Sequence, residues 1–165
     1  MDPETWTLNF GFGPGIKYYS GYTTGFGPAL SLSFEKGMWQ LGPGVLTLGA
    51  ELGFSYFSSS YKYNDFIGYS YSWISLVTAA RAAYHYGWKV RGLDTYGGLA
   101  TGLRFLIFHS TYYNGYATDY SPGAVNFFPG IFAGVSYFFN KSLGINAEVG
   151  YNNTYLQVGM IFKLR

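Results

Sequence analysis

The chain has 165 residues, including 24 glycines and no cysteine; 22% of the residues are aromatic and only 11% are charged. A water-soluble domain carries about a quarter charged residues, so this composition argues against a surface covered by water alone. The net charge of +2 and the scattered Lys and Arg residues argue against nucleic acid as a partner, and the lack of cysteine excludes disulfides and thiolate metal sites. The length indicates one domain over residues 1–165.

Apolar residues do not gather into a segment that could cross a membrane as a helix, because no window approaches the about 20 consecutive apolar residues that such a helix requires. Apolar and polar residues alternate instead. The strands of a transmembrane barrel have a polar lumen face and an apolar lipid face, which produces this alternation. The pattern predicts an all-β fold, a transmembrane eight-stranded antiparallel up-and-down β-barrel, located in the bacterial outer membrane.

Eight segments carry the alternation. In chain order they span residues 5–18, 26–35, 39–56, 74–84, 93–107, 127–139, 143–151 and 155–165. A loop over 19–25 joins the first two segments, and Lys36-Gly37 is predicted to form a tight turn after the second. The alternation slips at Gly42-Pro43-Gly44, which predicts a bulge or a bend within the third strand.

Two segments rich in Ser and Tyr, residues 57–72 and 108–124, are predicted to be long loops at one end of the barrel. The connections at the other end are short, and outer-membrane barrels combine short periplasmic turns with longer external loops. The tyrosines of the two long loops form a candidate surface for an external ligand or protein: Tyr61, Tyr63, Tyr69, Tyr71, Tyr112, Tyr113, Tyr116 and Tyr120. The alternative is that they only anchor the barrel in lipid headgroups.

The closing strand, residues 155–165, has one apolar face made of Leu156, Val158, Met160, Phe162 and Leu164, with Ile161 as the one apolar residue on the other face. Its run Gln157-x-Gly159-x-x-Phe162-x-Leu164 resembles the C-terminal signal by which outer-membrane barrels are recognised for insertion. The resemblance implies a closing strand in a lipid-embedded barrel, with the barrel-insertion machinery as a partner.

Several charged residues fall on the predicted lumen face: Lys17, Glu51, Arg81, Asp94, Arg104 and Glu148. Eight strands leave an interior that side chains roughly fill, and buried charges of both signs must pair. We therefore expect a lumen charge network that plugs the barrel, with a proton or ion path, or a gate, as the alternative.

No catalytic, cofactor or metal site is expected. The run from Gly11 to Lys17 lacks the spacing and the helix of a phosphate-binding loop. His109 and Ser110 invite comparison with outer-membrane lipid A deacylases, but neighbouring strand residues point to opposite faces and could meet only in an irregular loop. His85 is expected to be a hydrogen-bonding lumen residue, with no second His or carboxylate at ligand spacing beside it.

Four short motifs resemble, in their order and spacing, the small eight-stranded outer-membrane barrel proteins of Bacteroidetes-type bacteria (outer membrane protein A/X-like barrels). They are Gly42-Pro43-Gly44-Val45, Ala80-Arg81-x-Ala83-Tyr84-His85-Tyr86, Leu93-Asp94-Thr95-Tyr96-x-Gly98-Leu99 and Ala147-Glu148-x-Gly150-Tyr151. The resemblance covers nearly the whole chain and implies a barrel in a bilayer that contains lipopolysaccharide.

The expected function is structural or adhesive, through the external loops, without enzymatic activity. Three alternatives stay open from the sequence: a lipid-modifying enzyme of the lipid A deacylase kind, a narrow pore, and a soluble ligand-binding barrel of the lipocalin kind. The lipocalin alternative requires apolar residues inside and polar residues outside, the inverse of the faces assigned above.

Overall fold

The computed structural model describes the backbone of residues 2–15, 27–64, 67–114, 117–120 and 123–164, and their side chains apart from those of 61–64, 67–69, 113, 114 and 117–120. The strands in this part of the chain are β1 (Trp6–Pro14), β2 (Pro28–Leu41), β3 (Gly44–Asn64), β4 (Ile67–Gly87), β5 (Leu93–Asn114), β6 (Ala117–Tyr120), β7 (Gly123–Phe138), β8 (Leu143–Gly150) and β9 (Leu156–Leu164). Among the described residues, no helix is long and apolar enough to cross a membrane.

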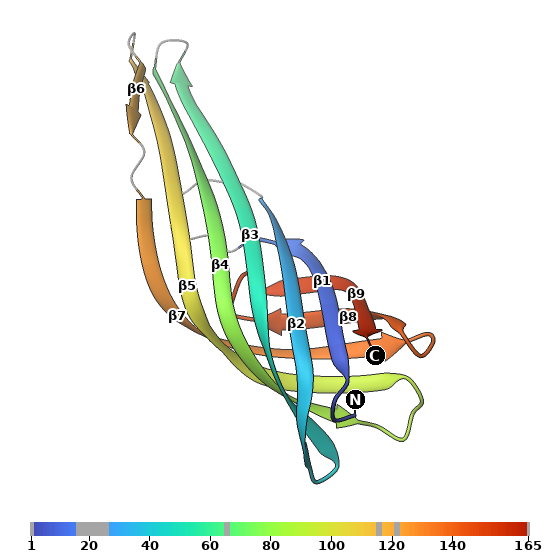
Figure 1. The fold of residues 1–165 in the computed structure, drawn as a ribbon. Helices are drawn as coiled ribbons and strands as arrows, with labels where there is room; N and C mark the ends of the chain where they lie inside the picture. Colours follow the sequence, from blue (N-terminus) through green and yellow to red (C-terminus); the bar gives the residue numbers. More distant parts are fainter. Residues whose placement is uncertain (1, 16–26, 65–66, 115–116, 121–122, 165) are drawn as a thin grey trace.

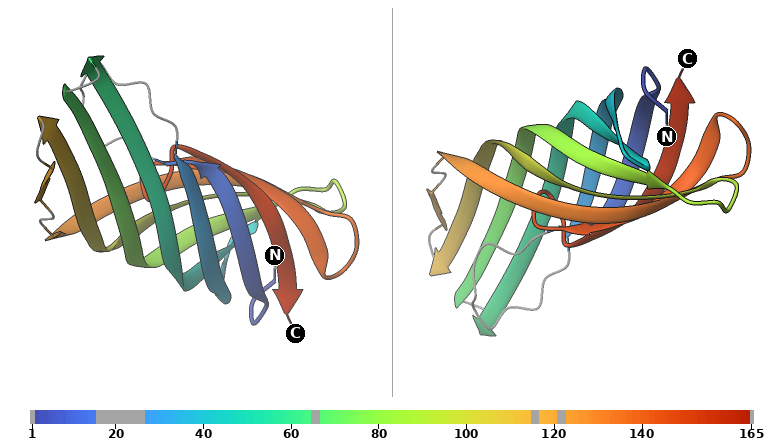
Figure 2. Two further views of the ribbon diagram at one scale, coloured as in Figure 1. Left: turned by 90° about the horizontal axis from the view of Figure 1, so that it is seen from above. Right: turned by 90° about the horizontal axis from the view of Figure 1, so that it is seen from below.

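All of these strands except β6 form a closed ring in which neighbours are antiparallel, in the order β1–β2–β3–β4–β5–β7–β8–β9. The ring closes where β9 pairs with β1, from Trp6 opposite Leu164 to Phe12 opposite Val158. Figures 1 and 2 show the strands wrapped around a common interior. The prediction of an eight-stranded antiparallel up-and-down barrel is confirmed.

The two faces of each strand differ in polarity as the alternation predicts. On the outside, Leu30 is 52% and Val158 is 56% exposed, whereas inside Arg81 is 3% and Glu148 is 2% exposed. Ile161, the apolar exception of the closing strand, lies inside. The lipocalin alternative is wrong, because the apolar face looks away from the barrel axis.

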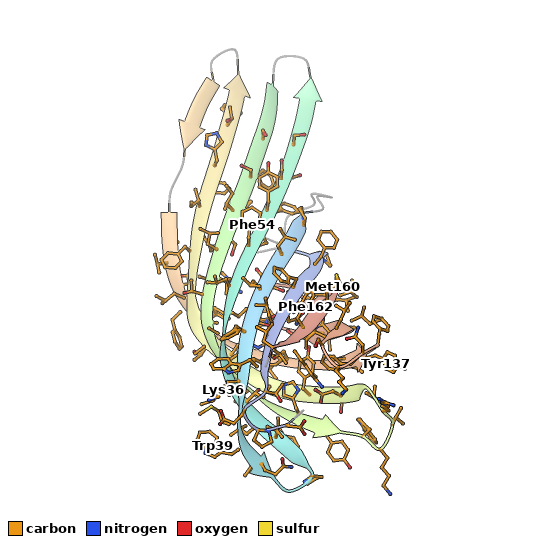
Figure 3. All side chains as sticks on the ribbon, turned by 45° about the vertical axis from the view of Figure 1, so that its right-hand side comes forward. Lys36, Trp39, Phe54, Tyr137, Met160 and Phe162 are labelled. Atoms are coloured by element: carbon orange, nitrogen blue, oxygen red, sulfur yellow. The ribbon has the colours of Figure 1, made fainter. Side chains whose placement is uncertain are left out.

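One end of the barrel, called the short-turn end below, carries three short turns, the start of β1 and the end of β9 (Figure 1). The turns span residues 42–43, 88–92 and 139–142. Gly42 and Gly92 have φ of +55° and +85°, a left-handed conformation that side chains disfavour. Figure 3 shows Trp39 and Tyr137 toward this end.

The turn predicted at Lys36-Gly37 is wrong. β2 continues to Leu41, with a register shift between Gly37 and Trp39, and the chain reverses at residues 42–43. The bulge therefore lies in β2, and the Gly-Pro-Gly segment predicted as a bulge or a bend contains the turn. An extra residue at a bulge inverts the alternation beyond it, which accounts for the slip seen in the sequence.

The two predicted long loops are also wrong, because most of their residues continue the strands. β3 and β4 pair without interruption from Tyr56 opposite Ile74 to Lys62 opposite Gly68. β5 continues to Asn114, β6 pairs with its far end, and β7 begins at Gly123. The structure thus has a protruding sheet made of residues 57–64 of β3, 67–73 of β4, 108–114 of β5 and 117–120 of β6, which extends beyond β1, β2, β8 and β9 (Figure 1).

Tyrosine is common in β-strands, so the Tyr-rich segments can form strands rather than loops. The first strand was expected over residues 5–18, and in the structure β1 ends at Pro14. Residues 16–18 and the predicted loop over 19–25 lie outside the described residues.

Candidate functional site

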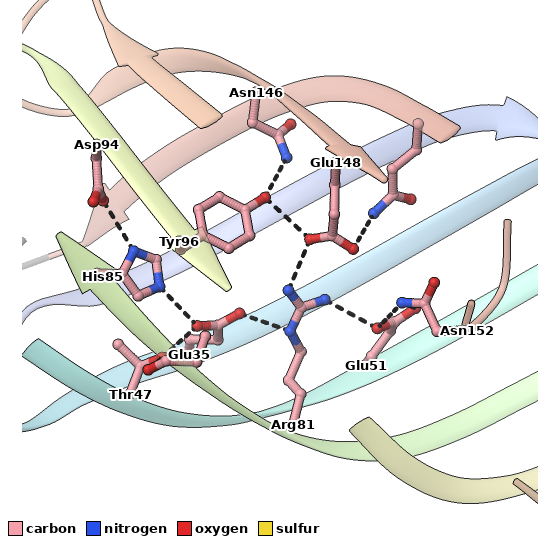
Figure 4. A network of polar contacts seen from close by, with 12 residues as sticks. Glu35, Thr47, Glu51, Arg81, His85, Asp94, Tyr96, Asn146, Glu148 and Asn152 are labelled. Atoms are coloured by element: carbon pink, nitrogen blue, oxygen red, sulfur yellow. Dashed lines mark hydrogen bonds and ion pairs between the residues drawn. The ribbon is translucent and has the colours of Figure 1, made fainter. Parts of the chain in front are cut away.

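The centre of the lumen is occupied by Arg81 of β4, whose guanidinium contacts three carboxylates from three other strands (Figure 4). Its Nε lies 2.7 Å from Oε1 of Glu35 on β2. Its Nη1 lies 2.9 Å from Oε2 of Glu51 on β3, and its Nη2 lies 2.8 Å from Oε2 of Glu148 on β8. These side chains are almost completely buried. One cation therefore holds three acidic groups across the barrel.

Neutral side chains supply the remaining hydrogen bonds of two of these carboxylates. Asn152 Nδ2 donates to both carboxylate oxygens of Glu51, at 3.0 and 2.9 Å. Tyr96 Oη donates to Glu148 Oε2 at 3.0 Å, and Gln157 Nε2 donates to Glu148 Oε1 at 2.9 Å. Buried carboxylates are stable only with such additional partners, so these residues belong to the same unit as Arg81.

His85 joins a second pair of carboxylates on the short-turn side of this unit. Its Nδ1 lies 3.0 Å from Asp94 Oδ2 and its Nε2 lies 3.2 Å from Glu35 Oε2. Thr47 Oγ1 donates to the same oxygen of Glu35 at 2.6 Å. The prediction that His85 is a hydrogen-bonding lumen residue is confirmed. Its two partners are distant in the sequence, because the closed barrel brings Asp94 of β5 and Glu35 of β2 to its two ring nitrogens. A doubly protonated ring would donate to both.

Aromatic rings complete the filling of the lumen. The Arg81 guanidinium lies 3.9 Å from the centroid of the Phe132 ring, a cation–π contact. The rings of His85 and Tyr96 stack at 4.9 Å. Tyr96 has room because Gly134 lies opposite it in the register; a Cβ on Gly134 would lie 2.4 Å from Tyr96 Cζ. The lumen is packed with side chains at this level.

In the structure Arg81 directly contacts Glu51 and Glu148, and Asp94 is connected to Arg81 through two residues, His85 and Glu35. Arg104 lies elsewhere in the lumen. Its Nη2 donates to the backbone carbonyl of Asn152, and its guanidinium lies 4.7 Å from the centroid of Phe128. Lys17 lies outside the described residues. In the described part of the chain, no group of three or more His, Cys, Asp or Glu side chains could hold a metal ion.

The predicted charge network did not include Glu35, Tyr96 or His85, which contact its members in the structure. Periodicity gave their direction but not their height along the barrel axis, which depends on register. Asn152 was assigned to a connection; in the structure it is buried and reaches Glu51. An inward asparagine directly after a strand is the signal that could have included it.

Seven of the eight candidate tyrosines lie in the protruding sheet. The backbone pairs Tyr61 of β3 with Tyr69 of β4, and Tyr69 with Tyr112 of β5. Among these residues with described side chains, the ring of Tyr71 lies 6.5 Å from that of Phe57. The remaining candidates fall in β3, β5, β6 and outside the described residues: Tyr63, Tyr113, Tyr120 and Tyr116 respectively.

His109 and Ser110 lie at successive positions of β5, opposite Ser72 and Tyr71 of β4. Successive residues of a strand point to opposite faces, so the regular strand holds the two side chains apart. Thr111 Oγ1 lies 3.4 Å from His109 Nε2.

No protein-family model matches the chain, and no curated protein matches it in sequence. The N-terminal β-barrel domain of Pseudomonas aeruginosa OprF is 16% identical, with 98% of each chain covered and a TM-score of 0.50. The attachment invasion locus protein Ail of Yersinia pestis, solved in complex with the heparin analogue sucrose octasulfate, is 11% identical, with 98% of this chain and 96% of that chain covered and a TM-score of 0.47. Neisserial surface protein A is 16% identical, with 97% and 94% covered and a TM-score of 0.44.

At such low identity the likeness to the OprF domain concerns the fold alone. It agrees with the ring of strands described above, and the exposed apolar outer face agrees with contact to hydrocarbon. The chain therefore has the fold and the surface polarity of a small eight-stranded outer-membrane β-barrel.

Proposed function

We propose that the protein is an integral outer-membrane β-barrel whose lumen is closed by its charge network and whose protruding sheet binds an external partner. The apolar outer face supports membrane residence, because residues such as Leu99 and Ile131 are 65% and 64% exposed and a transmembrane barrel presents such a face to lipid. The buried contacts of Arg81 support a structural role of the lumen. The proposal includes no enzymatic activity, so lipopolysaccharide incubated with the folded protein should keep its acyl chains.

The protruding sheet is the observation that carries the adhesive role. Beyond Ser55, no described residue of β2 pairs with β3, although β3 continues to Asn64. No described strand pairs with the outer edge of β6 either. A sheet edge with unpaired N–H and C=O groups can bind an extended peptide as an additional strand.

The amino-acid composition of this sheet also favours a peptide with few charges over a strongly charged partner. Its described segments carry Lys62 and Asp119 as their only Lys, Arg, Asp or Glu residues. They are rich in Tyr and Ser, which make adaptable contacts at low entropic cost. Main-chain hydrogen bonds to the edge would supply affinity, and the tyrosines would select the side chains of the partner.

The proposal can be tested with the protein reconstituted in phosphatidylcholine vesicles. The probe is fluorescent α-lactalbumin that has been reduced and carboxymethylated, which presents extended chain, and native α-lactalbumin is its folded control. In the test variant an Asn-Gly turn replaces residues 58–72, which removes the projecting parts of β3 and β4 and joins the paired residues Phe57 and Trp73 by a two-residue hairpin turn.

We expect the full-length barrel to bind the unfolded probe and not the folded one, and the trimmed barrel to lose this binding. Folding of both proteins is checked by their migration on unheated gels. Equal binding of the unfolded probe to the untrimmed and trimmed barrels would refute the adhesive role of the projecting parts of β3 and β4. The membrane residence of the barrel is judged separately, from vesicle insertion.

A further inference from the structure

A pocket of about 630 Å³ opens at the short-turn end of the barrel. Its walls come from the β4–β5 turn, the β7–β8 turn and the last residues of β9, and they include Arg91, Lys141, Lys163, Tyr137, Phe138 and Phe139. These residues define the basic pocket. Figures 1 and 2 show the two turns side by side near the C-terminal strand.

Backbone hydrogen bonds fix the three walls relative to one another. The amide of Phe138 donates to the carbonyl of Gly92 at 2.8 Å, which ties the two turns together. The amide of Lys163 donates to the carbonyl of Ser142 at 2.7 Å, which ties β9 to the second turn. Gly92 permits the close approach, because a Cβ there would lie 2.5 Å from the carbonyl oxygen of Phe138. The pocket is preformed.

Three cations line this pocket without a neutralising carboxylate. Ion pairs elsewhere in the described structure engage Lys36, Arg81 and His85; among the described residues, no carboxylate pairs with Arg91, Lys141 or Lys163.

Lys163 Nζ lies 3.9 Å from the centroid of the Phe138 ring, whereas Arg91 and Lys141 are exposed at the rim. Three positive charges around the basic pocket create a strong local attraction for an anion.

The surroundings of the pocket indicate where that anion lies. Tyr137 and Phe139 are exposed and their rings meet edge to face at 5.8 Å. Trp88 and Tyr86 form a second exposed aromatic pair at the neighbouring turn, at 5.0 Å. Exposed aromatic residues at the ends of a transmembrane barrel sit at the level of the lipid headgroups. The cations therefore lie at the height of lipid phosphates.

We propose that the basic pocket binds the phosphate headgroup of an anionic phospholipid from the leaflet at the short-turn end. Arg91 can form two parallel hydrogen bonds with the phosphate, Lys141 and Lys163 add charge, and Tyr137 and Phe139 contact the glycerol and the first acyl carbons. The inference rests on the proposed membrane residence, and it is independent of the adhesive role of the protruding sheet.

Native mass spectrometry of the folded protein in neutral detergent tests this site. The probes are dioleoylphosphatidylglycerol and dioleoylphosphatidylcholine, added separately at equal concentrations, and an equimolar amount of inorganic phosphate is the third arm. The test variant is R91Q/K141Q, which changes two exposed turn residues. K89Q is the matched control, because Lys89 lies in the same turn as Arg91 but does not line the pocket.

We expect one phosphatidylglycerol to remain bound in preference to phosphatidylcholine. A cation near a headgroup contributes about fivefold to affinity, so R91Q/K141Q should weaken phosphatidylglycerol binding about 25-fold, whereas K89Q should weaken it by less than about threefold. Equal retention of both lipids, an unchanged double variant, or an equal loss in K89Q would each overturn the proposal. Displacement of the lipid by inorganic phosphate would also overturn it, because the site would then be selective for a free anion.

Discussion

Replacement of Arg81 by glutamine removes a cation that contacts Glu35, Glu51 and Glu148 at the same time. The three carboxylates would remain in a lumen where Glu51 and Glu148 are 1% and 2% exposed. Water cannot compensate for the lost charge there, and the new amide is too short to reach all three partners. We expect R81Q to destabilise the barrel strongly.

Removing one partner of a buried ion pair costs about 3–5 kcal/mol, because the other charge is left without compensation. Arg81 serves three carboxylates, so the loss should fall at the upper end, about 4–5 kcal/mol. The control is K36Q. Lys36 Nζ lies 2.7 Å from Glu4 Oε2, a distance like those around Arg81, but the Glu4 side chain is 76% exposed, and such a pair contributes less than about 1 kcal/mol.

The free energy of unfolding can be measured by urea titration of the protein in lipid vesicles, followed by tryptophan fluorescence. The triple variant R81Q/E51Q/E148Q should regain at least half of the stability lost in R81Q, because two of the uncompensated charges are gone. A loss in R81Q no larger than that in K36Q, or a triple variant less stable than R81Q, would contradict the reasoning from burial.

Further predictions concern the outer face, the packing of the lumen and conduction. Leu99→Arg, on the lipid face of β5, should destabilise the barrel by about 2–4 kcal/mol in urea titrations, and Val90→Arg, in a turn, by about 0–1 kcal/mol; equal losses would contradict a membrane-embedded outer face. Gly134→Val should cost about 1–3 kcal/mol, because its Cβ would meet the Tyr96 ring, whereas Gly97→Val should cost little by the same measurement, because its Cβ would make only an ordinary contact at 3.7 Å with the Phe132 carbonyl oxygen. Planar bilayers should show no steady open conductance, and a stable open channel would contradict a lumen filled by side chains.

The sequence predicted the direction of side chains better than the ends of strands. Alternation places Leu30 and Leu103 outside and Arg81 and Glu148 inside, and the structure agrees at these positions. Alternation depends only on the two-residue period of a strand. The same signal fails where polar Ser and Tyr occupy both faces, as between residues 57 and 72, because neither face of a sheet that projects from the membrane has to be apolar.

The members of the lumen charge network were harder to predict than the existence of such a network. Inward charges of both signs indicate that ion pairs must form, but which groups meet depends on the relative shift of neighbouring strands. A single bulge between Gly37 and Trp39 alters that shift for β2 relative to β3. Glu35 lies just before this bulge, and its contacts with Arg81 and His85 follow from a register that periodicity does not encode.

The partners of Arg81 reach it from distant parts of the chain, and this has a consequence for assembly. Glu35 and Glu51 arrive on strands that precede Arg81, whereas Glu148 arrives on β8 and is held by Gln157 of β9. A half-assembled protein would have an acidic residue of its final hairpin still without its counterion. The carboxylates around Arg81 are therefore all paired only when the last hairpin has joined the ring.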